Sequence, residues 1–441
     1  MSKETVVAGE WAAFVALDWG DREHSWALQA AGMQKRETGK LAQSPEAIES
    51  WAASLAARFG EGLIAVALEQ SRGALFCALS RYQNLILHPV PPAASARFRA
   101  FAAPSGSKSD DADASMLLDI LLWHRDKLRA LHPDDEPTRE QRALVEQRRQ
   151  LVDQKTATTN QMTALLKLSF PQVLEWFDET DSPLLAGFLR RWPTLPQLQA
   201  EQPESILQFL HSHNCRSQVR NRQRIEQIAS ARPLTTDPAV IDPSVLMVRT
   251  LLDIIEVLRA GIRTMEQRIE QLFAAHPDAA IFGSFPGAGP ALAPRLLVAF
   301  GSDRSRFASA AEVQTFSGIA PVVSQSGQSK WTHFRWACPK FLRQTFHEFA
   351  ALSIQQCAWA RAFYALQRGR AKGHHAAVRS LAYKWIRILY ACWRDRTPYQ
   401  ESRYTERTQA RSAQRPKEIA KAVQFQFKNV AGFAKLSGSA S

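Results

Sequence analysis

The chain has few cysteines and no long apolar run. Its 441 residues include five cysteines, which are scattered and never spaced as Cys-x-x-Cys. This pattern argues against a disulfide framework and against a zinc site. No apolar run approaches the roughly 20 residues needed to cross a bilayer, and the N-terminal residues lack the core of a signal peptide. We therefore expect a cytoplasmic protein with no membrane partner and with two or three domains.

The chain also has no acidic excess. The net charge is +13, and residues 361–441 account for all of it, with 17 Lys and Arg against 4 Asp and Glu. Residues 1–360 contain 38 of each kind. A basic segment of this sort is typical of proteins that bind a polyanion, and nucleic acid is the first candidate. The alternative is a solvated tail that only aids solubility.

Short apolar runs alternate with turns over residues 11–95, which is typical of β-strands. A helical pattern within this region predicts a crossover connection, and the apolar positions from Asp113 onward predict a further helix packed on the sheet. We therefore predict a mixed α/β domain over residues 1–135. The apolar runs lie at residues 14–17, 26–28, 63–68 and 85–87, and the crossover helix at residues 73–79.

Long helices are predicted in the middle of the chain. Residues 138–168 are polar with sparse apolar positions, whereas apolar residues recur with spacings of three and four from Val248 to Leu272. A stripe this regular predicts a two-helix seam, either with residues 138–168 of the same chain or between protomers. Residues 170–245 are interpreted as a helical insertion, and no function is assigned to them.

A third unit begins near residue 278 with a turn from Gly287 to Gly289. A Gly-x-Gly turn between helices lets backbone amides approach a phosphate, as in helix-hairpin-helix DNA binders, but a plain αα-hairpin turn has the same pattern. Helices are predicted over residues 341–367 and 374–394. The second interleaves aromatic and basic residues, which suits base stacking, although such a stripe also suits a core. Its aromatic residues are Trp385, Tyr390 and Trp393.

Four carboxylates are the strongest chemical signal in the chain. Asp18 and Glu69 each close an apolar run that predicts a strand, and Asp110 and Asp113 share the string KSDDADA. Residues three apart lie on one face of a helix, so the last two can point together. Clustered carboxylates repel unless cations neutralise them, and two Mg²⁺ ions roughly 3.5–4 Å apart can clamp both oxygens of a phosphoryl displacement. The alternative is that the helical pair only caps its helix and suits the helix dipole.

Several short motifs follow one another along the chain. They are an Asp, a Glu, Lys-Ser-Asp-x-x-Asp-Ala, a coiled-coil middle, Pro-Gly-x-Gly-Pro, and Ser-Gly after Gly-Ile-Ala-Pro. In this order they resemble the DEDD transposases of bacterial insertion sequences, the bridge-RNA-guided serine recombinases. The strings at residues 338–344, 370–379 and 384–387 also look like one subgroup of that family. Each motif alone is weak evidence, but their collinear order covers most of the chain.

The resemblance implies an α/β plus all-α fold class. Residues 1–135 would form a RuvC-like catalytic domain with an RNase-H-type mixed sheet. Coiled-coil helices would follow over residues 136–277, with the helical insertion at about 170–245. Residues 278–400 would form a helical transposase domain that carries a nucleophilic serine, and residues 401–441 a basic, flexible tail.

The resemblance also implies a catalytic centre. The family's nucleophilic serine falls by position on Ser326, which would attack a DNA phosphate and form a phosphoserine link. The acidic tetrad would hold Mg²⁺, with two ions per site, and falls on Asp18, Glu69, Asp110 and Asp113.

The segment around the serine leaves two points open. Ser324 and Ser329 are competing nucleophiles. No base is evident near Ser326 in the sequence, which favours a composite site that draws on the distant tetrad of the same or of another protomer. Many relatives have a glycine-rich, basic stretch after the serine, whereas residues 331–336 of this chain read WTHFRW. The residues expected to contact nucleic acid are Lys108, Gly287, Gly289, Lys330, Arg335, Arg343, Lys372, His374, His375, Arg379 and Lys384.

Three functions are compatible with these features. The first is a transposase that excises and inserts its own element. Its partners would be the DNA ends of the element, target DNA and a structured guide RNA. It would act as a dimer or tetramer associated with a bacterial nucleoid. The second is a junction-resolving nuclease that uses the carboxylates with water and leaves Ser326 idle. The third is a non-enzymatic scaffold that binds RNA or DNA through its basic C-terminal part.

Overall fold

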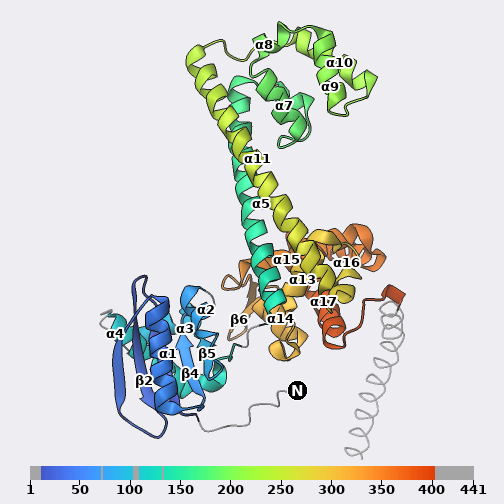
Figure 1. The fold of residues 1–441 in the computed structure, drawn as a ribbon. Coiled ribbons are helices and arrows are strands. Elements are labelled where there is room, and N and C mark those ends of the chain that lie inside the picture. Colours follow the sequence, from blue (N-terminus) through green and yellow to red (C-terminus); the bar gives the residue numbers. More distant parts are fainter. Residues whose placement is uncertain (1–10, 71–72, 103–108, 132–133, 403–441) are drawn as a thin grey trace, which may run out of the picture. The chain divides into compact units, whose positions relative to one another are not determined.

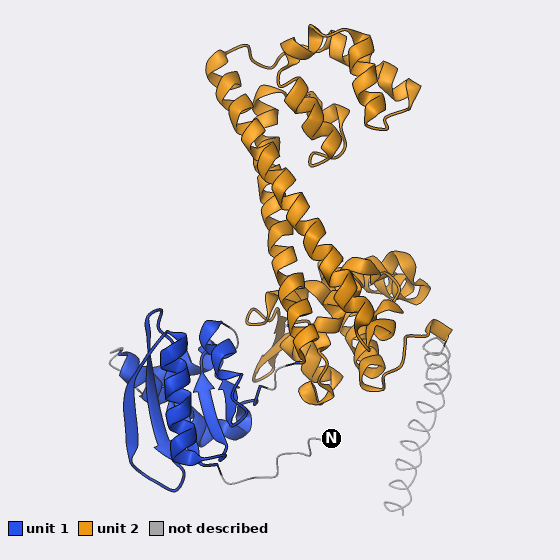
Figure 2. Ribbon diagram, viewed as in Figure 1, with its two compact units in different colours: residues 1–134 blue, residues 135–441 orange. Residues whose placement is uncertain are grey.

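The computed structural model describes residues 11–70, 73–102, 109–131 and 134–402. The chain divides into two compact units, residues 1–134 and 135–441, which are described separately (Figure 2). Lys108 and residues 403–441, which are most of the expected basic tail, lie outside the described residues. Within the described ranges no helix is long and apolar enough to cross a membrane.

The first unit is a five-stranded mixed sheet with helices packed on it (Figure 1). Its strand order is β3-β2-β1-β4-β5, with β2 antiparallel to β1 and β3, and with β4 parallel to β1 and β5. This is the order of an RNase-H-like sheet, and the predicted fold class is confirmed. The strands are β1 (Ala13–Asp18), β2 (Glu23–Ala30), β3 (Arg36–Ala42), β4 (Ile64–Leu68) and β5 (Leu85–Pro89). The helices are α1 (Pro45–Phe59), α2 (Ala74–Leu79), α3 (Pro92–Ala102), α4 (Asp110–His124) and the short η1 (Arg125–Lys127).

Side-chain alternation divides the two central strands between two cores. Val15 and Leu17 of β1 pack with large apolar side chains of β4, α1 and α2. Ala16 of β1 and Ala65 and Ala67 of β4 point to the opposite face and pack with α4. Because these three side chains are small, α4 can lie close to the centre of the sheet.

The edge strand β3 carries no apolar signal and was not predicted. Among its seven residues only Leu41 is buried, and the others are exposed or half-buried. Its pairing with β2 runs from Arg36 to Ala42. Backbone hydrogen bonds, rather than an apolar face, therefore hold this strand in the sheet.

The second unit is built on two long antiparallel helices, α5 (Glu136–Ser169) and α11 (Pro238–Ala275). One end of the pair joins a core that contains Val145 and Ile269, and the other end joins a core that contains Met162 and Val248. Ion pairs also cross the seam, including Arg268 to Glu140 at 2.8 Å. The apolar stripe of α11 therefore packs against α5 of the same chain, which is the first of the two predicted alternatives, and it gives no argument for a dimer.

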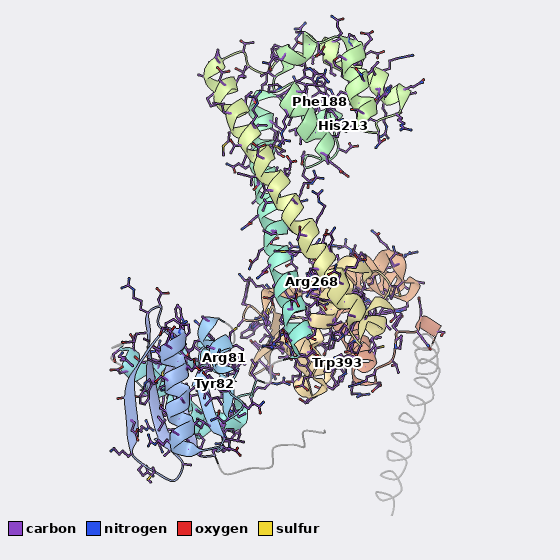
Figure 3. The ribbon with its side chains drawn as sticks, in the orientation of Figure 1. Arg81, Tyr82, Phe188, His213, Arg268 and Trp393 are labelled. Atoms are coloured by element: carbon purple, nitrogen blue, oxygen red, sulfur yellow. The ribbon has the colours of Figure 1, made fainter. Side chains whose placement is uncertain are left out.

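The predicted insertion is a small helical subdomain at one end of this pair (Figure 1). Its core is aromatic: Phe188 lies 5.2 Å from Trp192 and 6.0 Å from Phe209 between ring centroids. His213 packs on Phe209 at 4.3 Å, and Figure 3 labels Phe188 and His213 in this subdomain. The helices are α6 (Val173–Trp176), α7 (Pro183–Arg191), α8 (Leu195–Gln199), α9 (Pro203–Ser212) and α10 (Gln218–Ser230).

The C-terminal core surrounds the other end of the pair. Residues 341–367, predicted as one helix, form two helices that break at the extended Cys357. The aromatic residues of α17 are buried, with Trp385 and Trp393 fully inaccessible, so the stripe belongs to the core, which is the second of the two predicted alternatives. The elements are α12 (Ala279–Gly283), α13 (Gly289–Phe300), η2 (Arg304–Arg306), α14 (Ala310–Phe316), β6 (Val322–Ser326), β7 (Ser329–His333), α15 (Lys340–Gln356), α16 (Ala358–Gly369) and α17 (His374–Arg394).

Candidate active site

Two of the predicted acids leave the same edge of the first unit's sheet. β1 and β4 are parallel neighbours with Leu17 opposite Leu68, and Asp18 and Glu69 are the next residues of the two strands. Both acids are half-buried. Asp18 alternates with Ala16, and Glu69 follows Ala67 by two residues, so the alternation assigns both to the face that α4 covers.

The other two acids lie in the first turn of α4. Ser109 caps this helix, and its Oγ accepts a hydrogen bond from the amide of Ala112 at 3.3 Å. Negative side chains are favoured at this end of a helix because the peptide dipoles make it partly positive. Since α4 packs on β1, β2 and β4, the helix start and the two strand ends belong to one face of the sheet.

Asp113 is buried and paired with an arginine. Only 4% of the residue is exposed, and its Oδ1 accepts a hydrogen bond at 2.8 Å from Nε of Arg99 on α3. A carboxylate buried this deeply is costly unless a positive group compensates it. Arg99 supplies that charge in this structure, and no pattern in the sequence predicts this pairing.

A lysine from the edge strand reaches the exposed aspartate of α4. Nζ of Lys40 lies 2.6 Å from Oγ of Ser25 and 3.0 Å from Oδ1 of Asp111. Hydrogen bonds from Lys40 and then from Ser25 lower the pKa of Asp111, and the same contact with Asp111 raises the pKa of Lys40. Ser25 is paired with Asp18 across β1 and β2, so this lysine brings positive charge beside the acids.

The four predicted acids have the ligand chemistry of a site for a hard divalent cation, but their side chains do not converge on one point. Carboxylate oxygens are the ligands that Mg²⁺ prefers, and the four predicted residues come from adjoining elements on one sheet face. However, no three His, Cys, Asp or Glu side chains converge as a metal site in the described part of the chain. One oxygen of Asp113, Oδ1, accepts a hydrogen bond from Arg99. Holding a metal at the predicted acids would therefore require their side chains to rotate toward one another.

Ser326 lies in the second unit, at the tip of an exposed hairpin. β6 and β7 pair antiparallel with Ser326 opposite Ser329, and Gly327 in the two-residue turn has φ of +57°. A positive φ is favourable for glycine and costly for most other residues, which accounts for glycine directly after the serine. Both serines are exposed.

Ser324, the competing nucleophile, has a histidine partner. Its Oγ lies 3.2 Å from Nε2 of His333, whose Nδ1 lies 3.1 Å from the carbonyl oxygen of Phe334. A carbonyl can only accept, so Nδ1 carries the proton in this contact, and Nε2 of the neutral ring accepts from the serine. Strand alternation puts Ser324, Ser326 and His333 on the same face of the hairpin. His333 therefore serves Ser324 and not Ser326, because the register puts it opposite Val322, about 13 Å along the ribbon from Ser326 at roughly 3.3 Å per residue. The expectation that no base lies beside Ser326 in the sequence stays a prediction.

Several residues expected to contact nucleic acid lie in or after the hairpin. The guanidinium carbons of Arg343 on α15 and Arg379 on α17 lie 4.4 and 5.2 Å from the ring centroid of Phe334. Lys330 is on β7, and Arg335 follows it. Arg343 and Arg379 therefore meet at the ring of Phe334, although they come from two different helices. Lys330 and Arg335 lie in the segment just before and after that ring.

The remaining basic candidates lie around the start of α17. Lys372 bonds Oε1 of Gln367 at 2.7 Å, and His374 contacts the hydroxyl of Tyr364 at 2.8 Å. The ring of His375 lies 5.0 Å from that of His374. Lys384 points over the rings of Trp359 and Phe363, 5.1 and 4.6 Å from their centroids, which makes it a packing residue. 

The glycine turn precedes α13. Gly287 and Gly289 have φ values of +81° and +54°. A Cβ on Gly287 would lie 3.2 Å from the backbone of Leu352 and Ser353, so this glycine also permits close packing against α15. The αα-turn alternative accounts for Gly287 without a phosphate.

An RNase-H-like sheet with acids at the ends of its central strands is typical of enzymes that process nucleic acids. Residues 15–171 match the sequence family of DEDD-type IS110 transposases, and residues 279–365 match a family described as "Transposase IS116/IS110/IS902 family". The chain belongs to this family of transposases. Such a protein cuts and joins DNA.

Whole-length relatives agree with this assignment. The chain is 28% identical over 406 residues to the "Mini-circle putative transposase for IS117" of Streptomyces coelicolor, an alignment that covers 88% of this chain and 96% of the relative. It is 27% identical over 394 residues to an uncharacterized 43.6 kDa protein of insertion element IS110 from the same organism, covering 88% and 95%. A 42 kDa protein of insertion element IS900 from Mycobacterium paratuberculosis is 26% identical over 293 residues, covering 66% and 73%.

Proposed function

We propose that this transposase cuts and joins DNA strands through a covalent bond between DNA and Ser326, with Mg²⁺ held by Asp18, Glu69, Asp110 and Asp113. The observation that carries the proposal is the placement of the four acids. Two leave neighbouring parallel strands, and two open the helix that packs on the same sheet face. The resemblance of the motif order to serine recombinases supports the assignment of Ser326.

The four carboxylates would give the first unit a binding site for a cation. Asp113 is the most deeply buried of the four, and its contact with Arg99 holds the side chain in place. Mg²⁺, when bound, would neutralise charge on the phosphate and polarise it toward attack. Lys40, beside Asp111, would then attract the DNA backbone to the same edge of the sheet.

The serine step conserves the number of phosphodiester bonds. Oγ of Ser326 forms a bond to phosphorus while the bond from phosphorus to one deoxyribose oxygen breaks. The hydroxyl proton passes to a base, and the departing deoxyribose oxygen takes up a proton. A hydroxyl of another strand later attacks the same phosphorus and releases the serine. Rejoining therefore needs no external energy source.

His333 is the base that the hairpin offers to Ser324, whereas the base for Ser326 would come from outside the hairpin or be replaced by the metal. Nε2 of His333 already accepts from the Ser324 hydroxyl, and the carbonyl of Phe334 fixes its tautomer. A hydroxyl is a weak nucleophile until a base or a metal activates it. Ser324 is the second candidate nucleophile because it, and not Ser326, has this contact in the structure.

The partners in this proposal are element and target DNA, a structured guide RNA and further copies of the chain. The excess of 13 positive charges in residues 361–441 supports a polyanionic partner. The RNA would bind the first unit and neighbouring basic surfaces and would set the choice of target.

Trapping of the covalent intermediate tests the proposed function. Purified protein, with its co-purified RNA, is incubated with DNA carrying an element end and Mg²⁺, and protein–DNA species that survive denaturation are mapped by mass spectrometry. We expect phosphoserine at residue 326, with no adduct in Ser326→Ala or after chelation. A phosphopeptide at residue 324 would move the nucleophile by two residues, and strand joining by Ser326→Ala without any adduct would reject serine chemistry.

The RNA partner is tested separately. RNA that co-purifies with the full chain is sequenced, and we expect one discrete structured species. A heterogeneous pool that matches total cellular RNA would contradict guidance by RNA and leave the cutting reaction untouched.

A further inference from the structure

Exposed aromatic side chains gather on and after the serine hairpin. Trp331 on β7 is 54% exposed, and Trp336 is 81% exposed. Trp336 makes an edge contact with Phe334, with ring centroids 5.4 Å apart at 78°. Large apolar surface left in water is unfavourable, and a concentration of it marks a binding surface.

The aromatic residues are accompanied by arginines. Arg343 and Arg379 lie over Phe334, and neither forms an ion pair with a carboxylate in the part of the chain that the structure describes. The buried Nε of Arg335, between Phe334 and Trp336, has no hydrogen-bond partner among those residues. Guanidinium groups and aromatic rings in this arrangement can stack on bases and bind phosphates.

The surrounding sequence supplies almost no acid to neutralise these arginines. Residues 313–394 contain twelve Lys and Arg and one acidic residue, Glu348. That carboxylate is engaged by Arg295 at 2.5 Å and by Arg149 at 3.3 Å. The charges around Phe334 are therefore available to an anionic ligand.

We propose that this surface binds unpaired bases of single-stranded DNA by stacking, with its arginines on the adjoining phosphates. We call it the aromatic–arginine surface, and it consists of Trp331, Phe334, Trp336, Arg343 and Arg379. The inference rests on the proposed function, because it takes the strand attacked by the hairpin serine as its ligand.

Two features favour single-stranded DNA over duplex DNA and RNA as the ligand of this surface. In a duplex the faces of the bases are covered by their neighbours, so an exposed indole can stack only where a base is unpaired or at an end. Strand alternation puts Trp331 on the same hairpin face as Ser326, so a base stacked there belongs to the strand whose phosphate reaches the serine. That strand is DNA in a transposition reaction.

Equilibrium binding with matched variants tests the inference. All variants are made in the full-length Ser326→Ala protein and measured in chelator, so that neither cleavage nor metal contributes. The ligands are one labelled oligodeoxynucleotide as a single strand, its duplex, and an RNA of the same sequence. Binding is followed by fluorescence anisotropy, and thermal unfolding checks each fold.

We expect Trp336→Ala to weaken single-stranded DNA binding about tenfold, because it removes the aromatic face on which one base would stack. Trp336→Phe retains an aromatic face and should stay within about threefold of the parent. Val323→Ala is the control, because Val323 is 51% exposed on the opposite face of the same hairpin and should have no effect. Duplex binding should change by less than about threefold in every variant, since phosphates dominate it.

The outcomes separate this inference from the proposed function. Unchanged single-strand binding in both Trp336→Ala and Trp331→Ala overturns the inference, as does equal loss on duplex, or loss confined to RNA. The serine adduct is assayed independently in the wild-type protein. An adduct without an aromatic effect rejects only the stacking surface, and an aromatic effect without an adduct rejects only serine chemistry.

Discussion

The two groups of candidate catalytic residues are held in different ways. Asp18 and Glu69 extend strands whose preceding residues, such as Ala16 and Ala67, are fully buried between two layers of helices. Ser326 ends a two-stranded ribbon that is exposed or half-buried along its whole length. A ribbon of two strands is marginally stable by itself in water. The acids are therefore positioned by the fold, whereas the position of the serine depends on what binds its hairpin.

The largest expected effect is on DNA cleavage, and it separates two aspartates of the same helical turn, Asp113 and Asp111. We expect Asp113→Asn to reduce DNA strand cleavage at least about 10³-fold, because it removes one of the four carboxylates proposed to hold the metal. The control is Asp111→Asn, which changes the same helical turn and breaks an exposed pair with Lys40, and should stay within about threefold. Cleavage of element-end DNA is measured with saturating Mg²⁺, and both variants are checked by thermal unfolding. Equal losses in the two variants would contradict the assignment of faces.

The second difference is stability. Leu117 is fully buried between α4 and the sheet, so Leu117→Ala should lower the free energy of unfolding by about 2–5 kcal/mol. Val323→Ala in the hairpin should change it by less than about 0.5 kcal/mol. Urea denaturation gives the free energies, and hydrogen exchange of α4 amides locates the loss in the first unit. A comparable loss from Val323→Ala would show that the hairpin is packed as firmly as the sheet.

The third difference concerns the base on the hairpin. His333 contacts Ser324, and the register puts it about 13 Å along the ribbon from Ser326. We therefore expect His333→Gln to leave adduct formation on Ser326 within about threefold of the wild type, whereas it would slow an adduct on Ser324 about 10²-fold, the ordinary contribution of a general base. Single-turnover rates with excess protein provide the measurement. A loss of about 10²-fold in His333→Gln would move the nucleophile to Ser324.

The smallest expected effect is a change in the pKa of Asp111. Lys40→Met should raise the pKa of Asp111 toward its ordinary value, because the hydrogen bond from Lys40 is the main cause of its lowering. A carboxyl pKa that is lowered in the folded state favours folding above the ordinary carboxyl pKa, and this contribution is lost as the pH falls through the folded value. A carbon-detected NMR titration of the aspartate side chains follows the change. An unshifted Asp111 would mean that the lysine is not in contact with it in solution.

The sheet was predictable wherever burial imposes a pattern on the sequence. Apolar runs that end at Asp18 and Glu69 fixed two central strands and, by alternation, the face of their acids. The edge strand β3 was missed because a single buried residue, Leu41, leaves no period to detect. The hairpin β6–β7 was missed for the same reason, since neither strand has a buried face.

Contacts between distant residues could not be read from local sequence. Arg99 and Lys40 neutralise two aspartates of α4, but they come from a neighbouring helix and an edge strand. His333 was overlooked as a partner for Ser324 because only antiparallel pairing returns it to that face. The buried aromatic residues of α17 were ambiguous, since helical spacing is the same for a core and for a surface.

The paired helices α5 and α11 also set the distance between the two apolar cores of the second unit. At 1.5 Å per residue, the 34 residues of α5 extend about 51 Å, with one apolar core at each end. The number of helical residues in the pair therefore sets how far apart the insertion and the C-terminal core are held within the second unit.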